Sequence, residues 1–342
     1  MLNYIDISTE WNKTNIINNN SKTFLDIFSG CGGMSLGLVL SGWKPIGAIE
    51  INKAAIETYK NNFSFGEIIF NLDITKKETK KKIINHYKNI SIDLICGGFP
   101  CQGFSLAGKR NLEDTRNSLY YDMLEIVSEL SPKYLFMENV SGILSMNKGL
   151  VLKKILNDYD QLGYDLDYQL LNSVNYEVPQ LRKRVIFIGN NRNEINLYPL
   201  PIITDKTKFK TIEDSISDII NLNENKNFNH IFTKHSNEMI KNIGFVKEGE
   251  SLYKNFSDSW KRCYWKQPSN TIKENHGGVN IHPLLNRVMT PRELARIQSF
   301  PDNFIFYGTK SQQLVQIGNA VPPLLSKSIG LSILKMRNEN EK

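Results

Sequence analysis

Residues 97–105 (GGFPCQGFS) contain the side chain best suited to covalent chemistry, the thiol of Cys101. An apolar run, 92–95, precedes them and predicts a buried strand that stops at two glycines. Pro100 fixes the backbone directly before Cys101, at the strand end where open α/β sheets place their chemistry. Cysteine is a strong nucleophile near neutral pH when its pKa is lowered locally. The alternative is a free cysteine that acts as a small buried hydrophobe.

A second candidate site follows the apolar strand predicted at 23–28. Residues 29–37 (SGCGGMSLG) form a glycine turn that leads into a helix, a pattern that brings backbone amides close to a ligand. The strand predicted at 45–49 ends at Glu50, about 20 residues further on, where a carboxylate can accept from ribose hydroxyls. A dinucleotide-binding fingerprint would require glycine at position 35, where this chain has Ser35, so a nicotinamide oxidoreductase is disfavoured.

Two further strand ends carry charge. The predicted strand 134–137 delivers Glu138, which could also be a carboxylate capping the next helix. Arg182 and Arg184 precede the apolar run 185–189, and their spacing of two places both side chains on one side of a strand. The plainer interpretation of the arginines is a pair of surface cations.

Taken together and in this order, these motifs resemble those of the DNA cytosine-5 methyltransferase family. The resemblance covers about residues 23–335 and also includes 287–302 (RVMTPRELARIQSFPD) and 316–323 (QIGNAVPP). It implies a doubly wound, Rossmann-like α/β fold that binds S-adenosylmethionine, with a small inserted target-recognition domain. Thr290 and Pro291 predict the start of a helix.

The resemblance assigns roles residue by residue. The catalytic residues would be Cys101, Glu138, Arg182 and Arg184. Phe28 would stack near the adenine, Asp73 would contact its amino group, and Leu119 would border the cofactor. Asn319 would complete the methionine end of the site. The full cofactor set is Phe28, Gly30, Gly32, Gly33, Glu50, Ile51, Asp73, Ile74, Pro100, Leu119 and Asn319, and the DNA contacts are Gln102, Ser105, Arg116 and Gln180.

The implied reaction transfers a methyl group to carbon-5 of a flipped cytosine in duplex DNA, through a Cys101 adduct at carbon-6. A restriction-modification setting with a cognate endonuclease is expected from the family, with a monomer and no metal. Two alternatives remain: a transfer-RNA cytosine-5 methyltransferase on the same scaffold, and a silent DNA-binding relative. The intact catalytic set argues against the second.

Composition agrees with a polyanionic partner. The 342 residues carry a formal charge of +7, although basic surfaces are common. The four cysteines show no metal-ligand spacing, and no leader or long apolar run is present. These features predict a cytoplasmic, nucleoid-associated protein.

Domain organisation follows from the change of pattern along the chain. Residues 1–20 are expected to be a loosely ordered lead-in and 21–190 the catalytic domain. Residues 191–286, polar and basic with interleaved aromatic residues, are expected to form the recognition domain. Residues 287–342 would return to the catalytic domain.

Overall fold

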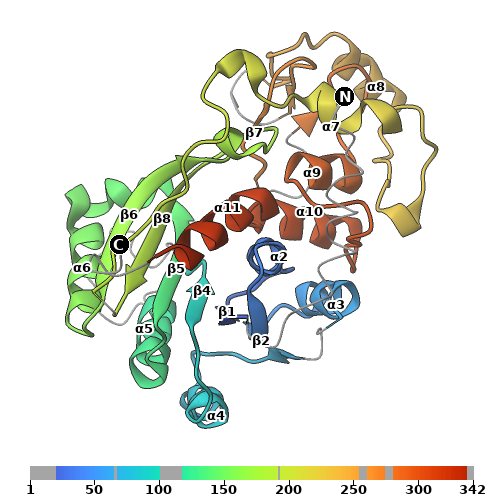
Figure 1. Ribbon diagram of the computed structural model, residues 1–342. Helices are drawn as coiled ribbons and strands as arrows, with labels where there is room; N and C mark the ends of the chain where they lie inside the picture. The colour runs from blue at the N-terminus through green and yellow to red at the C-terminus, as the bar shows by residue number, and fades with distance from the viewer. Residues whose placement is uncertain are drawn as a thin grey trace.

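A seven-stranded sheet organises the protein. The computed structural model describes residues 21–64, 68–100, 118–191, 193–253, 260–273 and 280–336. The spatial order of the strands is β3 (Ile69–Asn71), β2 (Lys44–Glu50), β1 (Thr23–Ile27), β4 (Leu94–Gly97), β5 (Tyr134–Val140), β8 (Lys183–Asn190) and β6 (Asp165–Asn172) (Figure 1). The first five are parallel, whereas β8 runs antiparallel to both β5 and β6.

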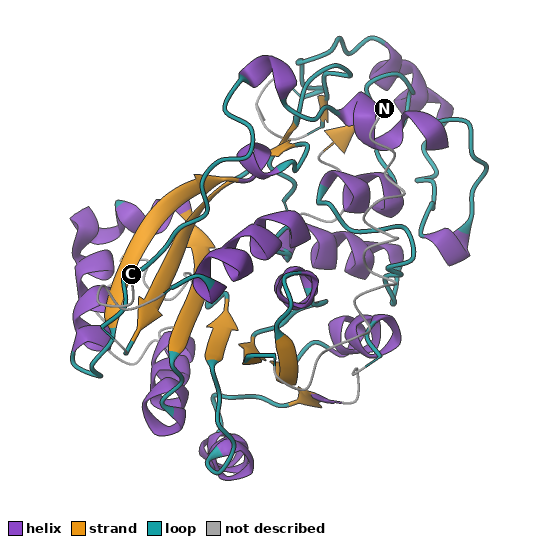
Figure 2. Ribbon diagram, viewed as in Figure 1, coloured by secondary structure: helices purple, strands orange, loops and turns teal. Residues whose placement is uncertain are grey.

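Helices cover both faces of this sheet (Figure 2). Alternate side chains of β5 enter opposite layers: Phe136 packs in the cluster that contains α2 and α11, and Leu135 packs in the cluster under α4, α5 and α6. The doubly wound α/β fold expected from sequence is therefore confirmed. The helices are α2 (Gly33–Leu40), α3 (Lys53–Asn62), α4 (Lys77–Tyr87), α5 (Ser118–Leu130), α6 (Leu150–Asp160), α7 (Ile212–Ile216), α8 (Asn237–Gly244), α9 (Pro291–Ile297), α10 (Lys310–Asn319) and α11 (Pro323–Leu334).

The edge strand β6 has no counterpart among the sequence predictions. Half of its residues are exposed and only Leu171 is buried, so its sequence, DLDYQLLN, lacks the apolar run that reveals the inner strands. Four shorter strands lie beyond the main sheet and pair in parallel as β10 (Ser269–Asn270) with β7 (Gln180–Leu181), and β11 (Asn280–Ile281) with β9 (Lys261–Arg262).

The end of the chain returns to its beginning, because α11 packs on α2. Ser326 Oγ donates to the carbonyl of Met34 at 2.8 Å, and Trp43 Nε1 donates to the carbonyl of Gly330 at 3.0 Å. A Cβ atom at Gly37 would lie 2.4 Å from the carbonyl oxygen of Pro323. The two helices therefore approach as closely as glycine permits.

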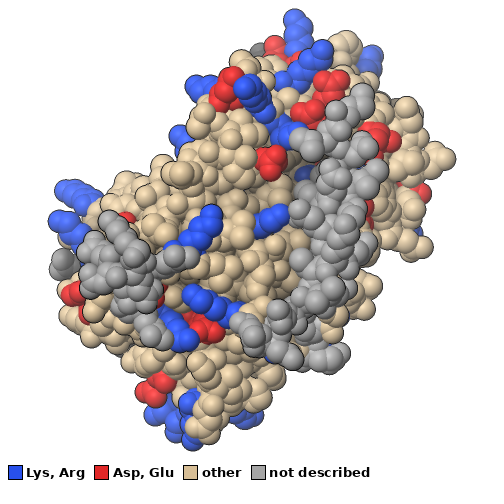
Figure 3. Space-filling model, in the orientation of Figure 1, with Lys and Arg blue, Asp and Glu red and all other residues tan. Residues whose placement is uncertain are grey.

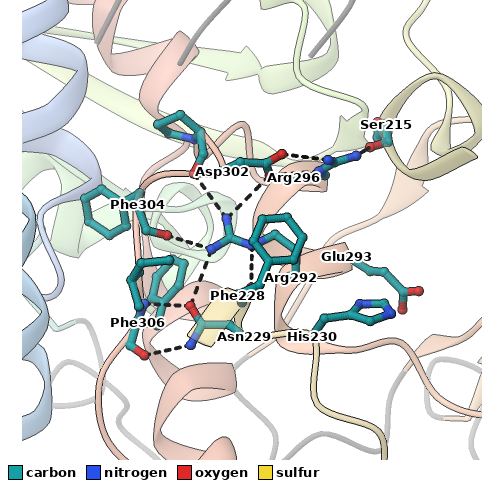
Figure 4. Close-up of polar contacts among 12 residues, drawn as sticks. Ser215, Phe228, Asn229, His230, Arg292, Glu293, Arg296, Asp302, Phe304 and Phe306 are labelled. Atoms are coloured by element: carbon teal, nitrogen blue, oxygen red, sulfur yellow. Dashed lines mark hydrogen bonds and ion pairs between the residues drawn. The ribbon is translucent and has the colours of Figure 1, made fainter. Parts of the chain in front are cut away.

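A buried arginine of α9, Arg292, joins residues 228–229 to residues 301–304 (Figure 4). Arg292 donates through Nε to the carbonyl of Phe228 at 2.9 Å and through Nη2 to the carbonyl of Phe304 at 2.8 Å. Asn229 pairs with the backbone of Phe306 in both directions, each at 2.8 Å. Because each guanidinium nitrogen donates to a carbonyl and the group lies over the Phe228 ring, burial of its charge is tolerated.

The expected helix start at Thr290 is confirmed. Thr290 caps α9 in a capping box with Glu293, and Pro291 occupies the first turn. The helix ends at Ile297, earlier than the motif itself, which runs to residue 302.

On the surface, Lys and Arg side chains lie at both ends of the face drawn in Figure 3 and along the hollow between them, interspersed with Asp and Glu. Among the helices of the described ranges, none combines the length and apolar character needed to cross a membrane.

Gly37→Ala is expected to destabilise the protein by about 2 kcal/mol, because the new methyl group would force α2 and α11 apart. Urea denaturation would measure the change. Gly142→Ala is the matched control, since nothing lies within 4 Å of a Cβ atom there. Equal losses in the two variants would contradict the close approach.

Candidate active site

A cleft of about 740 Å³ opens at the carboxyl ends of β1, β2, β4 and β5. Its other walls come from Thr271–Lys273, a segment far along the chain, and from the junction between α10 and α11. Strand ends of a parallel sheet meet at one edge, which brings residues distant in sequence into one site.

The glycine turn forms one wall of the cleft. Phe28, Gly30 and Gly33 line it. Gly30 has φ +55° and Gly32 has φ +96°, both in the left-handed region where glycine is favoured. Gly32 does not line the cleft that the described residues form, and a Cβ atom there would lie 2.5 Å from the ring of Phe63. Its contact with a cofactor therefore stays a prediction.

Glu50 is held rigidly beside this turn. Its Oε2 accepts from the amide of Gly30, and its Oε1 accepts from the amides of Ile51 and Asn52, each at 2.8 Å. A carboxylate offers about four lone-pair sites, so Oε2 can still accept another hydrogen bond. Glu50 and Ile51 both line the cleft, and the free site on Oε2 fits the ribose hydroxyl that the sequence predicted.

Three predicted cofactor residues lie elsewhere. Asp73 accepts from the backbone and hydroxyl of Thr75, and the hydroxyl bond lowers the pKa of Asp73. Ile74 is buried in the core, and Leu119 packs against the same apolar cluster. None of the three lines the cleft that the described residues form, so their contacts with a cofactor stay predictions.

Asp26 lies at the floor of the cleft and was not singled out from sequence. The hydroxyl of Ser35 donates to its Oδ2 at 2.6 Å, and the hydroxyl of Tyr59 donates to Ser35 at 3.1 Å. Burial raises the pKa of Asp26 to about 7 despite the Ser35 hydrogen bond. The sequence feature that could have pointed to Asp26 is the presence of a carboxylate inside the apolar run 23–28.

Glu138 and Arg184 form the charged end of the cleft. Arg184 Nε lies 2.8 Å from Glu138 Oε1 in an ion pair whose partners are both mostly buried. The pair exists because β8 runs antiparallel beside β5, which places Arg184 opposite Val140. A Cβ atom at Gly98 would lie 3.5 Å from Glu138 Oε2, so the predicted nucleophile loop begins against this carboxylate.

Asn139 ties that loop to β5. Its Nδ2 donates to the carbonyl of Phe99 at 3.0 Å, and Pro100, the next residue, lines the cleft. The four predicted residues that follow lie outside the described residues: Cys101, Gln102, Ser105 and Arg116.

Arg182 differs from the sequence prediction in its setting. It lies between β7 and β8, and its Nη1 and Nη2 donate to the carbonyls of Ile272 and Ala320, each at 3.1 Å. Burial, assisted by the Arg184 cation, lowers the pKa of Arg182 to about 9. Both arginines line the cleft, as predicted, but only Arg184 contacts Glu138 in an ion pair.

Gln180 was predicted to contact DNA, and that contact stays a prediction. Its side chain is 0% exposed, and both of its amide atoms are used internally. Asn319, in contrast, lines the cleft and is exposed, as expected for a residue that meets a ligand.

Among the described residues that line the cleft, three buried polar atoms have no hydrogen-bond partner: Ser29 Oγ, Arg182 Nε and Glu138 Oε1, of which the last lies in the ion pair with Arg184. Buried polar groups in native proteins are almost always satisfied. A ligand in the cleft would supply an acceptor for Arg182 Nε, which donates, and a partner for the hydroxyl.

Comparisons with known proteins show the family to which the chain belongs. The family model of the C-5 cytosine-specific DNA methylases matches residues 22–335. The chain is 36% identical to the Type II methyltransferase M1.HphI of Haemophilus parahaemolyticus, over 94% of this chain and 88% of that protein. It is 35% identical to the Type II methyltransferase M.DdeI of Desulfomicrobium norvegicum, over 89% and 86%.

Solved structures show the same fold. A protein assigned as a DNA modification methyltransferase encoded within an E. coli prophage superposes with a TM-score of 0.73 at 28% identity, over 92% of this chain and 99% of that one. The S. pombe Dnmt2 methyltransferase superposes with a TM-score of 0.68 at 18% identity, over 92% and 98%, which shows the fold alone.

The fold and the cleft define an S-adenosylmethionine-dependent methyltransferase. The chain belongs to the C-5 cytosine-specific DNA methylase family. It is a DNA (cytosine-5)-methyltransferase that takes its methyl group from S-adenosylmethionine.

Asp26→Asn is expected to flatten part of the pH dependence of stability. The raised pKa means that the folded protein holds a proton which the unfolded chain releases above about 4. Stability from this group is present below pH 4 and is lost as the pH rises towards 7. Asparagine keeps an acceptor for Ser35 but does not titrate.

Urea unfolding of cofactor-free protein between pH 5 and 7 measures this effect. Relative to the variant, the wild type should lose about 1.4 kcal/mol per pH unit. A stability difference that stays constant with pH would contradict the assignment.

Proposed function

We propose that this methyltransferase modifies a flipped cytosine in a short specific duplex sequence, through a covalent Cys101 adduct at carbon-6. The observation that carries the proposal is the Glu138–Arg184 ion pair at one end of the cleft, beside the loop that leads through Pro100 into Cys101. The glycine turn and Glu50 form the opposite wall.

Glu138 and the two arginines activate the cytosine ring. Carbon-5 of cytosine is a poor nucleophile until the Cys101 thiolate adds to carbon-6. Glu138 then holds the ring nitrogen-3 and the exocyclic amine, where positive charge develops. Arg184 fixes the orientation of Glu138 through their 2.8 Å ion pair, and both arginines favour the thiolate and bind the cytosine carbonyl oxygen.

The methyl donor fits the remaining part of the cleft. Glu50 would accept from its ribose, Phe28 would stack near its adenine, and Asn319 would border its methionine end. When bound, S-adenosylmethionine supplies an electrophilic methyl group. After carbon-5 is methylated, loss of its proton and departure of the Cys101 thiolate restore the aromatic ring.

The target base must leave the duplex to reach this cleft, at a cost of a few kcal/mol. Gln102, Ser105 and Arg116 are proposed to contact the DNA around the vacated position. Residues 191–286 are proposed as the domain that reads the sequence, with 287–342 returning to the catalytic domain. The setting is the cytoplasm, on nucleoid DNA, where a monomer protects host sites from a cognate endonuclease.

Wild-type protein is expected to transfer labelled methyl groups to unmethylated genomic DNA, and Cys101→Ser should abolish the transfer because serine is not ionised near neutral pH. Scintillation counting gives the rate, and bisulfite sequencing of the product reads the methylated sequence.

Each outcome has a distinct meaning. Label in transfer RNA and none in DNA would favour an RNA substrate. DNA binding without transfer to either would mean that the motifs are a retained scaffold. A Cys101→Ser variant with full activity would contradict the covalent mechanism.

Glu138→Gln should lower the methylation rate by about 100-fold or more, because the amide cannot carry the charge that steadies the protonated ring. Affinity for S-adenosylmethionine, measured by calorimetry, should stay within twofold. Glu57→Gln, at an exposed position of α3, serves as the control and should keep full activity. Equal rates in the two variants would remove Glu138 from the mechanism.

A further inference from the structure

Behind one wall of the cleft, three distant segments meet around the side chain of Gln298, which directly follows α9. They are β7 with Arg182, the segment that follows β10, and the junction of α10 with α11. Gln298 is 0% exposed and does not line the cleft itself.

The contacts form a closed ring of five residues. Gln298 Oε1 accepts from Gln180 Nε2 at 2.7 Å, and Gln180 Oε1 accepts from the amide of Ile272 at 2.9 Å. The carbonyl of Ile272 accepts from Arg182 Nη1 at 3.1 Å. Arg182 Nη2, at 3.1 Å, and Gln298 Nε2, at 3.3 Å, both donate to the carbonyl of Ala320, which closes the ring.

Only one arrangement of donors satisfies this ring. Gln298 Nε2 must donate, because it faces the carbonyls of Ala320 and Ile317, the latter at 2.7 Å. Its Oε1 therefore faces Gln180 Nε2, and Gln180 Oε1 must face the amide of Ile272. Turning either side-chain amide over would set donor against donor in a buried site, so the ring is rigid.

The ring reaches the chemistry through three of its members. Arg182, Ile272 and Ala320 all line the cleft, although they come from three different segments. Within the described ranges, the Arg182 side chain donates to the carbonyls of Ile272 and Ala320, and these two carbonyls set its direction. Gln298 binds the carbonyl of Ala320, and Gln180 binds the backbone N–H of Ile272, the residue that supplies the second carbonyl.

We propose that Gln298 is a positioning residue for methyl transfer. Through Gln180 it holds Ile272, and by its own side chain it holds Ala320, so that both carbonyls aim the Arg182 guanidinium at the cleft. The segment after β10 and the catalytic arginine thereby move as one unit. This inference rests on the proposed function, because it assigns Arg182 to the cytosine site.

Gln298→Met tests the inference, since methionine keeps the length of glutamine but removes both hydrogen-bonding atoms. Gln313→Met is the matched control: Gln313 is also buried and donates to a carbonyl, that of Gly308, but it touches neither the ring nor the cleft. Thermal unfolding of both variants measures the stability cost that the two changes share.

The readout is covalent capture on a duplex that carries 5-fluorocytosine at the target position found by bisulfite sequencing. The Cys101 sulfur bonds to carbon-6, and carbon-5 accepts the methyl group as the donor's sulfur–methyl bond breaks. Fluorine occupies the place of the proton that must leave, so Cys101 is not released and the adduct persists. Single-turnover capture then reports the chemical step for each folded molecule.

Gln298→Met should slow capture at least tenfold, while Gln313→Met stays within twofold of the wild type. The dissociation constant for S-adenosylmethionine should change less than twofold in both. Gln180→Met opens the ring from the other side and should match Gln298→Met. The double variant should be no slower than either single one, because the ring is already open.

Capture by Gln298→Met and Gln180→Met at the wild-type rate would overturn the inference and leave the proposed function standing. So would a loss of equal size in Gln313→Met. If Gln298→Met fails to fold, Gln180→Met decides the question alone. A wild-type protein that captures no duplex refutes the proposed function, and the inference with it.

Discussion

The close approach of α2 and α11 is the contact on which the rest of the structure depends. Gly37 and Gly33 leave no room for a side chain where the C-terminal segment crosses α2. A Cβ atom at Gly33 would lie 2.5 Å from the carbonyl of Val321. Because the helices touch here, residues from the α10–α11 junction can complete a cleft that begins at the strand ends. Without that contact the cleft would lack the wall that the α10–α11 junction supplies.

Buried guanidinium groups hold together what regular structure does not. In the described part of 193–286 the longest helix or strand is α8, with 8 residues. Three arginines nevertheless join neighbouring segments there through carbonyl oxygens. Arg262 binds carbonyls that include those of Val246 and His282, Arg292 binds Phe228 and Phe304, and Arg182 binds Ile272 and Ala320. A planar donor with five N–H groups suits this purpose, since it can donate to carbonyl oxygens of several backbone segments at once. In Arg182 the same property also serves the catalytic cleft.

Particular residues show how far pattern alone reaches. The predicted strands at 23–28, 45–49, 134–137 and 185–189 all exist, because apolar runs buried on both faces are unambiguous. The strand β6 was missed, since an exposed edge strand carries no such run. Gln180 was assigned to DNA by its motif, but the side chain turns into the ring around Gln298. Asp26 and Asn139 carried no assigned role, although both contact the parts of the chain that build the cleft.

By itself, the sequence determined the fold class, the family and the order of the chemical groups along the chain. These follow from local patterns: apolar runs, glycine turns and charged residues at strand ends. Only the tertiary structure decided which of those groups touch. Glu138 meets Arg184 because β8 runs antiparallel to β5, and Arg182 turns to two carbonyls because segments 90 and 138 residues away close around it. Such contacts depend on how distant segments pack, and no local pattern records that.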